Sequence, residues 1–550
     1  MNQPPARSAQ TDRFVHDRMP PPDAWPQLVY NLPELQFPPQ LNLVQRLLDD
    51  AVHTRGWGDR PLFRSDLRLL TYAQALREVE RIAHLLTHEL RLQPGNRVLL
   101  RGGNSIGMAL VWLAVVRCGL VAVATMPLLR AKELSEIIRK SEPALALCDQ
   151  ALLGELDSAT GGQLPTLAFN ASPDHAGSLE ARLVACPTGE PPCPTAATDV
   201  ALLAFTSGTT GVPKAAIHTH LDLAAACETW PRHVLRLTPS DIVAGSPPLA
   251  FTFGLGGLLV FPIWAGASVY FPDQPYTPKG MVEAMARHGV TVCYTAPTLY
   301  RQMAPFAQAQ GLPSLRISVS AGEGLPDTTR QLWKSATGLD MVDGIGATEM
   351  FHIFISSAGA DIRRGAIGRV VPGYQAKVVD DEGHEVPRGT VGKLAVVGPT
   401  GCRYLDDERQ RNYVRQGWNY PGDAFVQDDD GYFFYQARAD DMIITAGYNV
   451  GGPEVEDALM RHPAVAECGV VGQPDEERGM IVKAYCVLKP GHAGDQRMVE
   501  ALQEHVKQQL APYKYPRAIE FLDRLPRTET GKLQRYLLRQ RAQPSSTPTP

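Results

Sequence analysis

A run of hydroxyl residues, glycines and one lysine directly follows the apolar segment Val200 to Phe205. It reads Thr206-Ser207-Gly208-Thr209-Thr210-Gly211-Val212-Pro213-Lys214. Glycines let the backbone approach a ligand, exposed N–H groups and hydroxyls form a concave anion site, and a lysine adds positive charge. This chemistry suits a polyphosphate. Val212 and Pro213 separate the glycine from Lys214, so the run is not a Walker A loop, and a polar surface turn is the alternative reading.

Carboxylates and cations that could serve the same ligand occur later in the chain. Glu349 ends the segment Asp343-Gly344-Ile345-Gly346-Ala347-Thr348-Glu349 and offers a hard oxygen ligand suited to magnesium. Asp423 follows the turn Tyr420-Pro421-Gly422 and could accept both hydroxyls of a ribose. Arg438 could form a surface ion pair, and Lys532 lies on a Gly-containing loop, where a solvated side chain is the usual fate of a lysine.

Together these segments resemble the motifs of the adenylate-forming superfamily, which includes acyl-CoA synthetases, luciferases and peptide-synthetase adenylation domains. The resemblance implies that Lys532, Thr348 and Glu349 are catalytic, with Glu349 also the magnesium ligand, and that Asp440 is a hinge between two domains. It implies CoA binding by Gly447 and Tyr448. The implied ATP- and AMP-binding residues are Thr206, Ser207, Gly208, Thr209, Thr210, Lys214, Gly322, Glu323, Asp343, Gly344, Ile345, Gly346, Asp423 and Arg438.

The acid pocket is expected to be flat and apolar. The stretch from Ile242 to Pro272 contains no charged residue, so it lacks the carboxylate that an α-amino acid would need for its ammonium group. The segment Thr348 to Phe354 resembles the benzoate and 2-aminobenzoate CoA ligase branch, in which the histidine and isoleucine line an aryl pocket. Phe253 replaces the tyrosine usual in benzoate ligases, which favours 2-aminobenzoate. The implied substrate-binding residues are Thr252, Phe253, Gly254, Ala321, Gly346, His352 and Ile353.

The elements that must position these residues follow an α/β pattern. Apolar strand segments such as Ala144 to Cys148 and Thr291 to Thr295 alternate with amphipathic helical segments. Thr71 and Gln74 form a capping box before a helix, and Lys377 to Val379 and Lys393 to Val397 are expected to pair as a hairpin. We therefore predict a large domain of packed sheets and helices followed by a small, mobile α+β domain.

The length of 550 residues exceeds what one core can hold. We predict an N-terminal arm over residues 1–28, expected to be loose, and a large ATP- and acid-binding domain over 29–439. A small C-terminal domain over 440–541 and a disordered tail over 542–550 follow. Three prolines break the charge-free stretch from Ile242, so it is not a membrane span.

Composition limits the cellular context and the partners. The net charge of −5 argues against nucleic acid as the main partner, and nine scattered cysteines without a C-x-x-C pair indicate reduced thiols. Without the apolar core of a signal peptide near the N-terminus, the chain is expected to be cytoplasmic. The expected partners are a small aromatic acid, ATP, Mg²⁺ and CoA, with neither nucleic acid nor a membrane; a homodimer is left open.

The resulting hypothesis is an ATP-dependent ligase that joins 2-aminobenzoate or benzoate to CoA through an aryl-adenylate, releasing AMP and pyrophosphate. The alternatives within the fold are a ligase that loads a carrier protein and a CoA ligase for another aromatic or a medium-chain acid. Two alternatives involve a different chemistry. A kinase-like phosphotransferase would release ADP, and a non-catalytic ATP sensor would not need Lys532.

Overall fold

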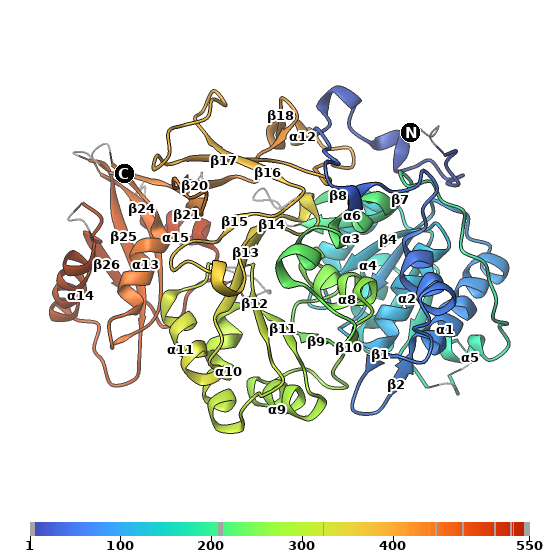
Figure 1. Ribbon diagram of the computed structural model, residues 1–550. Coiled ribbons are helices and arrows are strands. Elements are labelled where there is room, and N and C mark those ends of the chain that lie inside the picture. The colour runs from blue at the N-terminus through green and yellow to red at the C-terminus, as the bar shows by residue number, and fades with distance from the viewer. Residues whose placement is uncertain are drawn as a thin grey trace.

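The computed structural model describes residues 6–543 except 173, 176, 207–212, 323, 439–440, 446–447, 476–477, 511–512, 528–530 and 532. Two large sheets carry most of the first 370 residues, a third sheet follows, and a small domain ends the chain (Figure 1). The α/β class and the division into a large unit and a smaller C-terminal one are as predicted.

The first sheet has six strands in the order β6-β5-β3-β4-β7-β8, parallel except for the hairpin of β7 and β8. Side chains of β3 and β4 enter two different apolar clusters, one on each face of the sheet, as in parallel sheets covered by helices on both sides. Its strands are β3 (Arg97–Arg101), β4 (Val121–Thr125), β5 (Leu145–Asp149), β6 (Thr166–Phe169), β7 (Val200–Thr206) and β8 (Lys214–Thr219). Its helices are α1 (Tyr72–His84), η5 (Leu85–Glu89), α2 (Ile106–Arg117), α3 (Ala131–Ser141), α4 (Leu153–Thr160), α5 (Leu179–Leu183) and α6 (His220–Cys227).

The second sheet has nine strands in the order β15-β14-β13-β12-β11-β9-β10-β1-β2, with a parallel centre and antiparallel ends. Its strands are β1 (Pro61–Arg64), β2 (Leu69–Thr71), β9 (Ile242–Gly245), β10 (Ser268–Tyr270), β11 (Val292–Thr295), β12 (Ile317–Ser320), β13 (Met341–Gly346), β14 (Ile353–Ser356) and β15 (Arg369–Val370). Its helical segments are η4 (Gln45–Thr54), η7 (Pro231–Leu235), α7 (Thr252–Leu255), η8 (Gly256–Val260), α8 (Phe261–Ala265), α9 (Pro278–His288), α10 (Pro297–Gln310), α11 (Asp327–Thr337) and η9 (Thr348–Met350).

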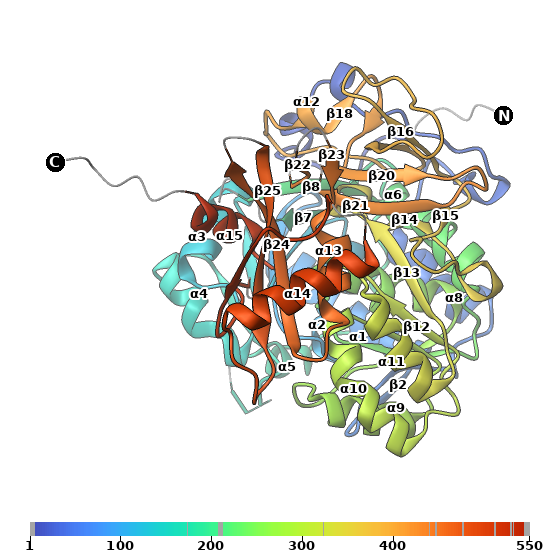
Figure 2. The same ribbon diagram turned by 90° about the vertical axis from the view of Figure 1, so that its left-hand side faces the viewer.

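The third sheet pairs its strands antiparallel, and it includes the predicted hairpin. Its elements are β16 (Gln375–Val379), β17 (Gly392–Val397), α12 (Gln410–Tyr413), β18 (Val414–Arg415), β19 (Trp418–Asn419), β20 (Asp423–Gln427) and β21 (Phe433–Arg438). A separate apolar cluster fills the small domain, at the left in Figure 1 and facing the viewer in Figure 2. Its elements are β22 (Ile443–Thr445), β23 (Tyr448–Val450), α13 (Gly452–Met460), β24 (Val465–Asp475), β25 (Gly479–Leu488), α14 (Gln496–Gln509), β26 (Ala518–Phe521) and α15 (Arg535–Ala542).

Both ends of the chain differ from the prediction. The described part of the N-terminal arm is not loose: Val15 is only 3% exposed, Ala9 donates its N–H to Asp199 at 2.9 Å, and Gln27 donates its N–H to Gly417 at 2.8 Å. The arm was misjudged because its partners are distant in sequence. At the other end, helix α15 includes Ala542, which is buried, so the predicted tail begins too early.

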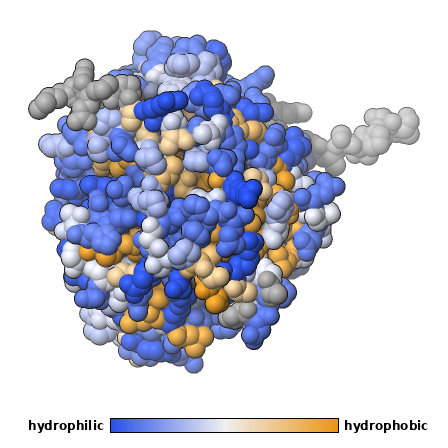
Figure 3. Space-filling view, turned by 90° about the vertical axis from the view of Figure 1, so that its right-hand side faces the viewer, coloured by the Kyte–Doolittle hydropathy of each residue, from blue (hydrophilic) through white to orange (hydrophobic). Residues whose placement is uncertain are grey.

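Other sequence expectations agree with the structure. Thr71 and Gln74 form the predicted capping box at the start of α1. The nine cysteines, all among the described residues, are free thiols. Among the described helices, none has both the length and the apolar character needed to cross a bilayer. Figure 3 shows a face on which hydrophilic residues predominate and apolar ones are scattered.

Candidate active site

The predicted phosphate loop connects β7 to β8 at the edge of the first sheet. Thr206 and Lys214 are register partners at the ends of these antiparallel strands, so the pairing fixes both ends of the loop. Ser207, Gly208, Thr209 and Thr210 lie outside the described residues. The structure therefore describes the two ends of the loop, Thr206 and Lys214, but not its centre.

Lys214 lies in a three-residue network with Glu349 and Tyr404. The Lys214 Nζ is 3.0 Å from the Tyr404 hydroxyl and 3.8 Å from a carboxylate oxygen of Glu349. The Tyr404 hydroxyl donates a short hydrogen bond to the same carboxylate. Burial, followed by the charge of Glu349, raises the pKa of Tyr404, which keeps this hydroxyl protonated and donating. The structure thus brings together the predicted lysine and the predicted metal ligand.

Tyr404 was not predicted from the sequence. It follows Gly401-Cys402-Arg403, a segment without a recognisable pattern of its own, and the link to Lys214 and Glu349 exists only in three dimensions. The ring is 1% exposed and meets Tyr413 edge-on at 5.8 Å between centroids. Tyr404 therefore holds Lys214 and the carboxylate of Glu349 in one arrangement.

The segment around Glu349 has a constrained backbone. Phe351 adopts φ 69° and ψ −49°, a conformation rare for a non-glycine residue. A Cβ on Gly346 would lie 2.5 Å from the carbonyl oxygen of His352, so only glycine fits there. The chain therefore turns sharply between Gly346 and Ile353, and Glu349 lies inside that turn.

His218, whose role here was not predicted from the sequence, supports this turn from β8. Its Nε2 donates to the carbonyl oxygen of Thr348 at 2.8 Å, and its ring meets Phe351 edge-on at 5.5 Å between centroids. Burial lowers the pKa of His218, so the ring is a neutral donor. The carbonyl of Thr348 is thereby tied to the strand that begins with Lys214.

His352 belongs to an aromatic cluster on the other side of the same turn. Its ring centroid lies 5.0 Å from that of Trp230, 5.6 Å from that of Phe253 and 4.6 Å from that of Phe261. Its Nε2 contacts the carbonyl oxygen of Phe253 at 3.3 Å, and burial lowers its pKa to about 3. Because His352 is neutral, it adds a flat surface without charge, which suits an aromatic ring.

Close packing defines the other predicted acid-binding residues. A Cβ on Gly254 would lie 2.2 Å from the carbonyl oxygen of Pro248, and one on Gly256 would lie 2.5 Å from the ring of His352. Thr252 is buried, and Ile353, the first residue of β14, is 2% exposed and packs against Gly344. The segment Ala250 to Gly256 thus packs against the segment Met350 to Phe354.

One predicted nucleotide segment follows β12, and the other forms the carboxyl end of the adjacent parallel strand β13. Ser320 of β12 pairs with Asp343 of β13, so Ala321 and Gly322 lie beside Gly344 and Ile345 at the carboxyl ends of these strands, the usual place for ligands in parallel sheets. The carboxylate of Asp343 is 3.3 Å from Arg330, and burial raises its pKa to about 6. Asp343 is therefore engaged within the protein. Glu323 lies outside the described residues.

Asp423 and Arg438 lie opposite each other in the third sheet. They are register partners of β20 and β21, and the guanidinium is 3.3 Å from the carboxylate. Gly422 has φ +86°, and a Cβ there would lie 2.7 Å from Arg438. The two predicted nucleotide residues thus form one charged pair beside a tight turn.

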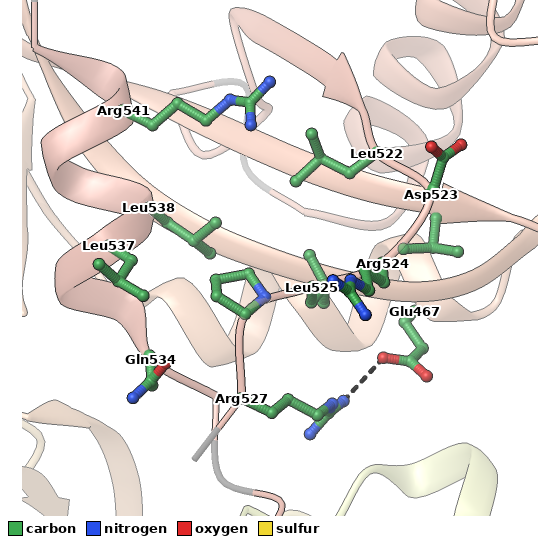
Figure 4. Close-up of a pocket in the computed structure, with 12 residues that line it drawn as sticks. Glu467, Leu522, Asp523, Arg524, Leu525, Arg527, Gln534, Leu537, Leu538 and Arg541 are labelled. Atoms are coloured by element: carbon green, nitrogen blue, oxygen red, sulfur yellow. Dashed lines mark hydrogen bonds and ion pairs between the residues drawn. The ribbon is translucent and has the colours of Figure 1, made fainter.

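The predicted residues of the small domain are mostly outside the described part of the chain. These are the hinge Asp440, Gly447 and Lys532; the backbone of Tyr448 begins β23, and its side chain is not described. The loop that carries Lys532 is closed by a bridge between Arg527 and Leu533. A cavity of about 720 Å³ lies beside this bridge and is lined entirely by residues of the small domain (Figure 4). Among them, Glu467 forms an ion pair with Arg527.

Comparison with known proteins agrees with this geometry. The family described as AMP-binding enzyme matches residues 50–403, and the family described as AMP-binding enzyme C-terminal domain matches residues 454–532. Benzoate–CoA ligase of Thauera aromatica is 35% identical over 514 residues, which is 92% of this chain and 97% of that protein.

Two solved structures extend the comparison to three dimensions. The anthranilate CoA ligase AuaEII in complex with anthranoyl-AMP superposes with a TM-score of 0.86 at 34% identity, covering 93% of this chain and 99% of that one. A benzoate CoA ligase from Burkholderia xenovorans LB400 superposes with a TM-score of 0.82 at 30% identity, covering 91% and 100%. The fold is therefore shared over more than nine-tenths of this chain.

Proposed function

The chain belongs to the AMP-binding enzyme family, and on that premise we propose that it is an ATP-dependent ligase that joins an aromatic acid to CoA. The observation that carries the proposal is the turn from Thr348 to Ile353. On one side, Glu349 meets Lys214 and Tyr404; on the other, His352 joins an uncharged aromatic cluster. One short segment thus connects a charged network that could bind phosphate to an apolar aromatic cluster that could bind an aryl ring.

In the first half-reaction, the carboxylate of the acid attacks the α-phosphate of ATP, and pyrophosphate leaves. No general base is required, because an aromatic carboxylate is ionised at neutral pH. Lys214 would bind the phosphates and Asp423 the ribose. Glu349, a hard oxygen donor held by Tyr404, fits Mg²⁺, which when bound neutralises charge on the phosphates. In the second half-reaction, CoA thiolate attacks the acyl carbon and releases AMP.

For the acid itself we propose 2-aminobenzoate or benzoate. Support comes from the neutral ring of His352, from Ile353 and from the comparisons with anthranilate and benzoate CoA ligases. Phe253 presents no hydroxyl to the cluster, which favours 2-aminobenzoate over benzoate. A carrier protein in place of CoA is the second candidate acceptor.

The direct test is pyrophosphate exchange driven by a panel of substituted benzoates and medium-chain acids, followed by product analysis with CoA or a carrier protein as acceptor. Aryl-dependent exchange, AMP formation and an aryl-CoA product are expected. Exchange with none of the aromatic acids contradicts the substrate class, and ADP in place of AMP contradicts the chemistry.

Lys532→Ala tests the role proposed for the C-terminal domain. A lysine that neutralises charge as carboxylate attacks phosphorus matters in the first half-reaction only. Adenylation should therefore fall by roughly 100-fold or more, in line with the loss of one preorganised charge-stabilising group. Thioester formation from supplied aryl-adenylate should persist. Equal loss of both half-reactions contradicts the assignment.

A further inference from the structure

Two histidines and a glutamate far from the candidate active site form a cluster. His84 Nδ1 lies 3.3 Å from Glu190 Oε2, and His88 Nε2 lies 3.1 and 3.0 Å from the two carboxylate oxygens. One ligand atom from each residue can be chosen so that all three lie within 4.8 Å of one another. The cluster is attached to α1, on the side of the molecule opposite the small domain (Figures 1 and 2).

The helix supplies the two histidines from one face. His84 ends α1 and His88 lies one turn later in η5, a four-residue spacing that places side chains next to each other. Their rings are 4.5 Å apart between centroids and tilted by 34°. One ring nitrogen of each histidine lies within 3.3 Å of the Glu190 carboxylate, so a divalent cation has ligand atoms from all three side chains close together.

The loop before β7, which carries Glu190, is held in place by contacts that do not involve the two histidines. The N–H of Gly189 donates to Glu80 at 2.9 Å, and Arg117 donates to the backbone carbonyl of Glu190 at 2.7 Å. Arg117 pairs through its charge with Asp49 at 2.5 Å, so the Glu190 carboxylate is left to the histidines and to the hydroxyl of Thr87 at 3.4 Å. Such outer contacts orient a metal-binding carboxylate.

We propose that His84, His88 and Glu190 bind a divalent transition-metal cation of the Zn²⁺ type, which clamps the loop around Glu190 onto η5. Two imidazole nitrogens and one carboxylate form a ligand set typical of Zn²⁺, whereas Mg²⁺ prefers oxygen ligands throughout. The side chain of His88 is 57% exposed, which leaves the cation a route from solvent and a coordination position for water.

The experiment is equilibrium dialysis of the full-length, chelator-treated protein against Zn²⁺, with metal content measured by mass spectrometry. His88→Ala changes an exposed side chain and should fold normally. His384→Ala is the matched control, because His384 also lies beside a carboxylate, Asp380 at 3.5 Å, and is 80% exposed. The parent and the control should bind one more equivalent than His88→Ala, or bind it at least tenfold more tightly. Equal binding by the parent and His88→Ala overturns the proposal.

Two further readouts identify the ligands and the effect of binding. Co²⁺ in the parent should give visible bands that are lost in His88→Ala and in Glu190→Gln, without the thiolate charge-transfer absorption that cysteine ligands would produce. Zn²⁺ should also slow proteolytic cleavage of the loop before β7 in the parent and in His384→Ala only. Thiolate absorption that persists in both variants, or cleavage indifferent to Zn²⁺ in the parent, contradicts the clamp.

Discussion

At the scale of single residues, the most constrained position in the candidate site is the hydroxyl of Tyr404. It contacts both Lys214, the proposed phosphate-binding lysine, and Glu349, the proposed magnesium ligand. A hydrogen bond to a charged group contributes about 1.5–3 kcal/mol, and losing it leaves the charged partner to rearrange. In the proposed mechanism, the hydroxyl positions these two charged neighbours.

Tyr404→Phe removes that hydroxyl and little else. We expect pyrophosphate exchange to slow about 10- to 100-fold, the equivalent of a 1.5–3 kcal/mol hydrogen bond, with little change in KM for the acid. Tyr413→Phe is the control, because the neighbouring Tyr413 is also buried and its hydroxyl has no hydrogen-bond partner among the described residues. Equal slowing of both variants would show that packing, not the hydroxyl, is responsible.

Buried neutral histidines make the fold sensitive to acid. Burial lowers the pKa of His220 and His352 to about 3 from the ordinary value of 6.5. Between these two pH values, only the unfolded chain binds a proton at each of the two rings. The contribution of these rings to the free energy of unfolding is therefore complete above pH 6.5 and is lost as the pH drops toward 3. Each such histidine contributes a slope of about 1.4 kcal/mol per pH unit in that window.

His352→Phe should remove one of these contributions. The free energy of unfolding, measured in urea, should fall less steeply between pH 6 and pH 4.5 than in the parent. The difference in slope should correspond to roughly one bound proton. The same replacement at His53, an exposed residue of η4, is the control and should leave the slope as in the parent. A slope unchanged in His352→Phe would contradict the neutral, buried state.

At the scale of elements, the site depends on a turn that only glycine permits. Gly346→Ala would bring a Cβ to 2.5 Å from the carbonyl oxygen of His352, and one of the two strands would have to shift. Because Thr348 and Glu349 follow within three residues, we expect adenylation to fall more than tenfold, consistent with the sensitivity of catalysis to misplacement of about 1 Å.

The control for this prediction is Gly154→Ala. Gly154 lies within helix α4, away from the proposed site residues, and a Cβ added there would meet no atom within 4 Å beyond its chain neighbours and the nearby backbone of its own helix. Alanine in a helix is preferred to glycine by about 0.5–1 kcal/mol, so this variant should keep its activity and gain slightly in stability. Pyrophosphate exchange and thermal unfolding of the two variants side by side provide the measurement.

Much of this element scale was accessible from the sequence, because its causes are local. The capping box of Thr71, the charge-free wall before Pro272 and the glycine-rich segments all carry their signal in adjacent residues. Tyr404 and His218 were not accessible, since their roles depend on contacts across 190 and 130 residues of chain. Periodicity and motif spacing do not report such pairs.

At the scale of the whole molecule, the N-terminal segment links two sheets. Gln10 donates to the carbonyl of Val200 in β7 at 2.7 Å, and Gln410, which precedes β18, donates to the carbonyl of Ala24 at 2.8 Å. Leu28 forms a bridge with Gly398 next to β17. The segment thus runs from the sheet that carries Lys214 to the sheet that carries Asp423.

Asp12→Ala tests whether this strap contributes stability. Asp12 forms an ion pair with Arg97, which is 6% exposed and cannot easily regain water when its partner is removed. We expect a loss of about 1–3 kcal/mol, the usual cost of leaving one side of such a pair unsatisfied, measured as an earlier first transition in urea. Asp23→Ala is the control on the same segment. The side chain of Asp23 is 72% exposed, and its ion pair with Arg411 is long, at 4.0 Å. If both variants unfold at the parent's urea concentration, the segment lies on the surface without stabilising it. If only Asp12→Ala unfolds early, the contact of the segment with β3 stabilises the first sheet, which also carries Lys214.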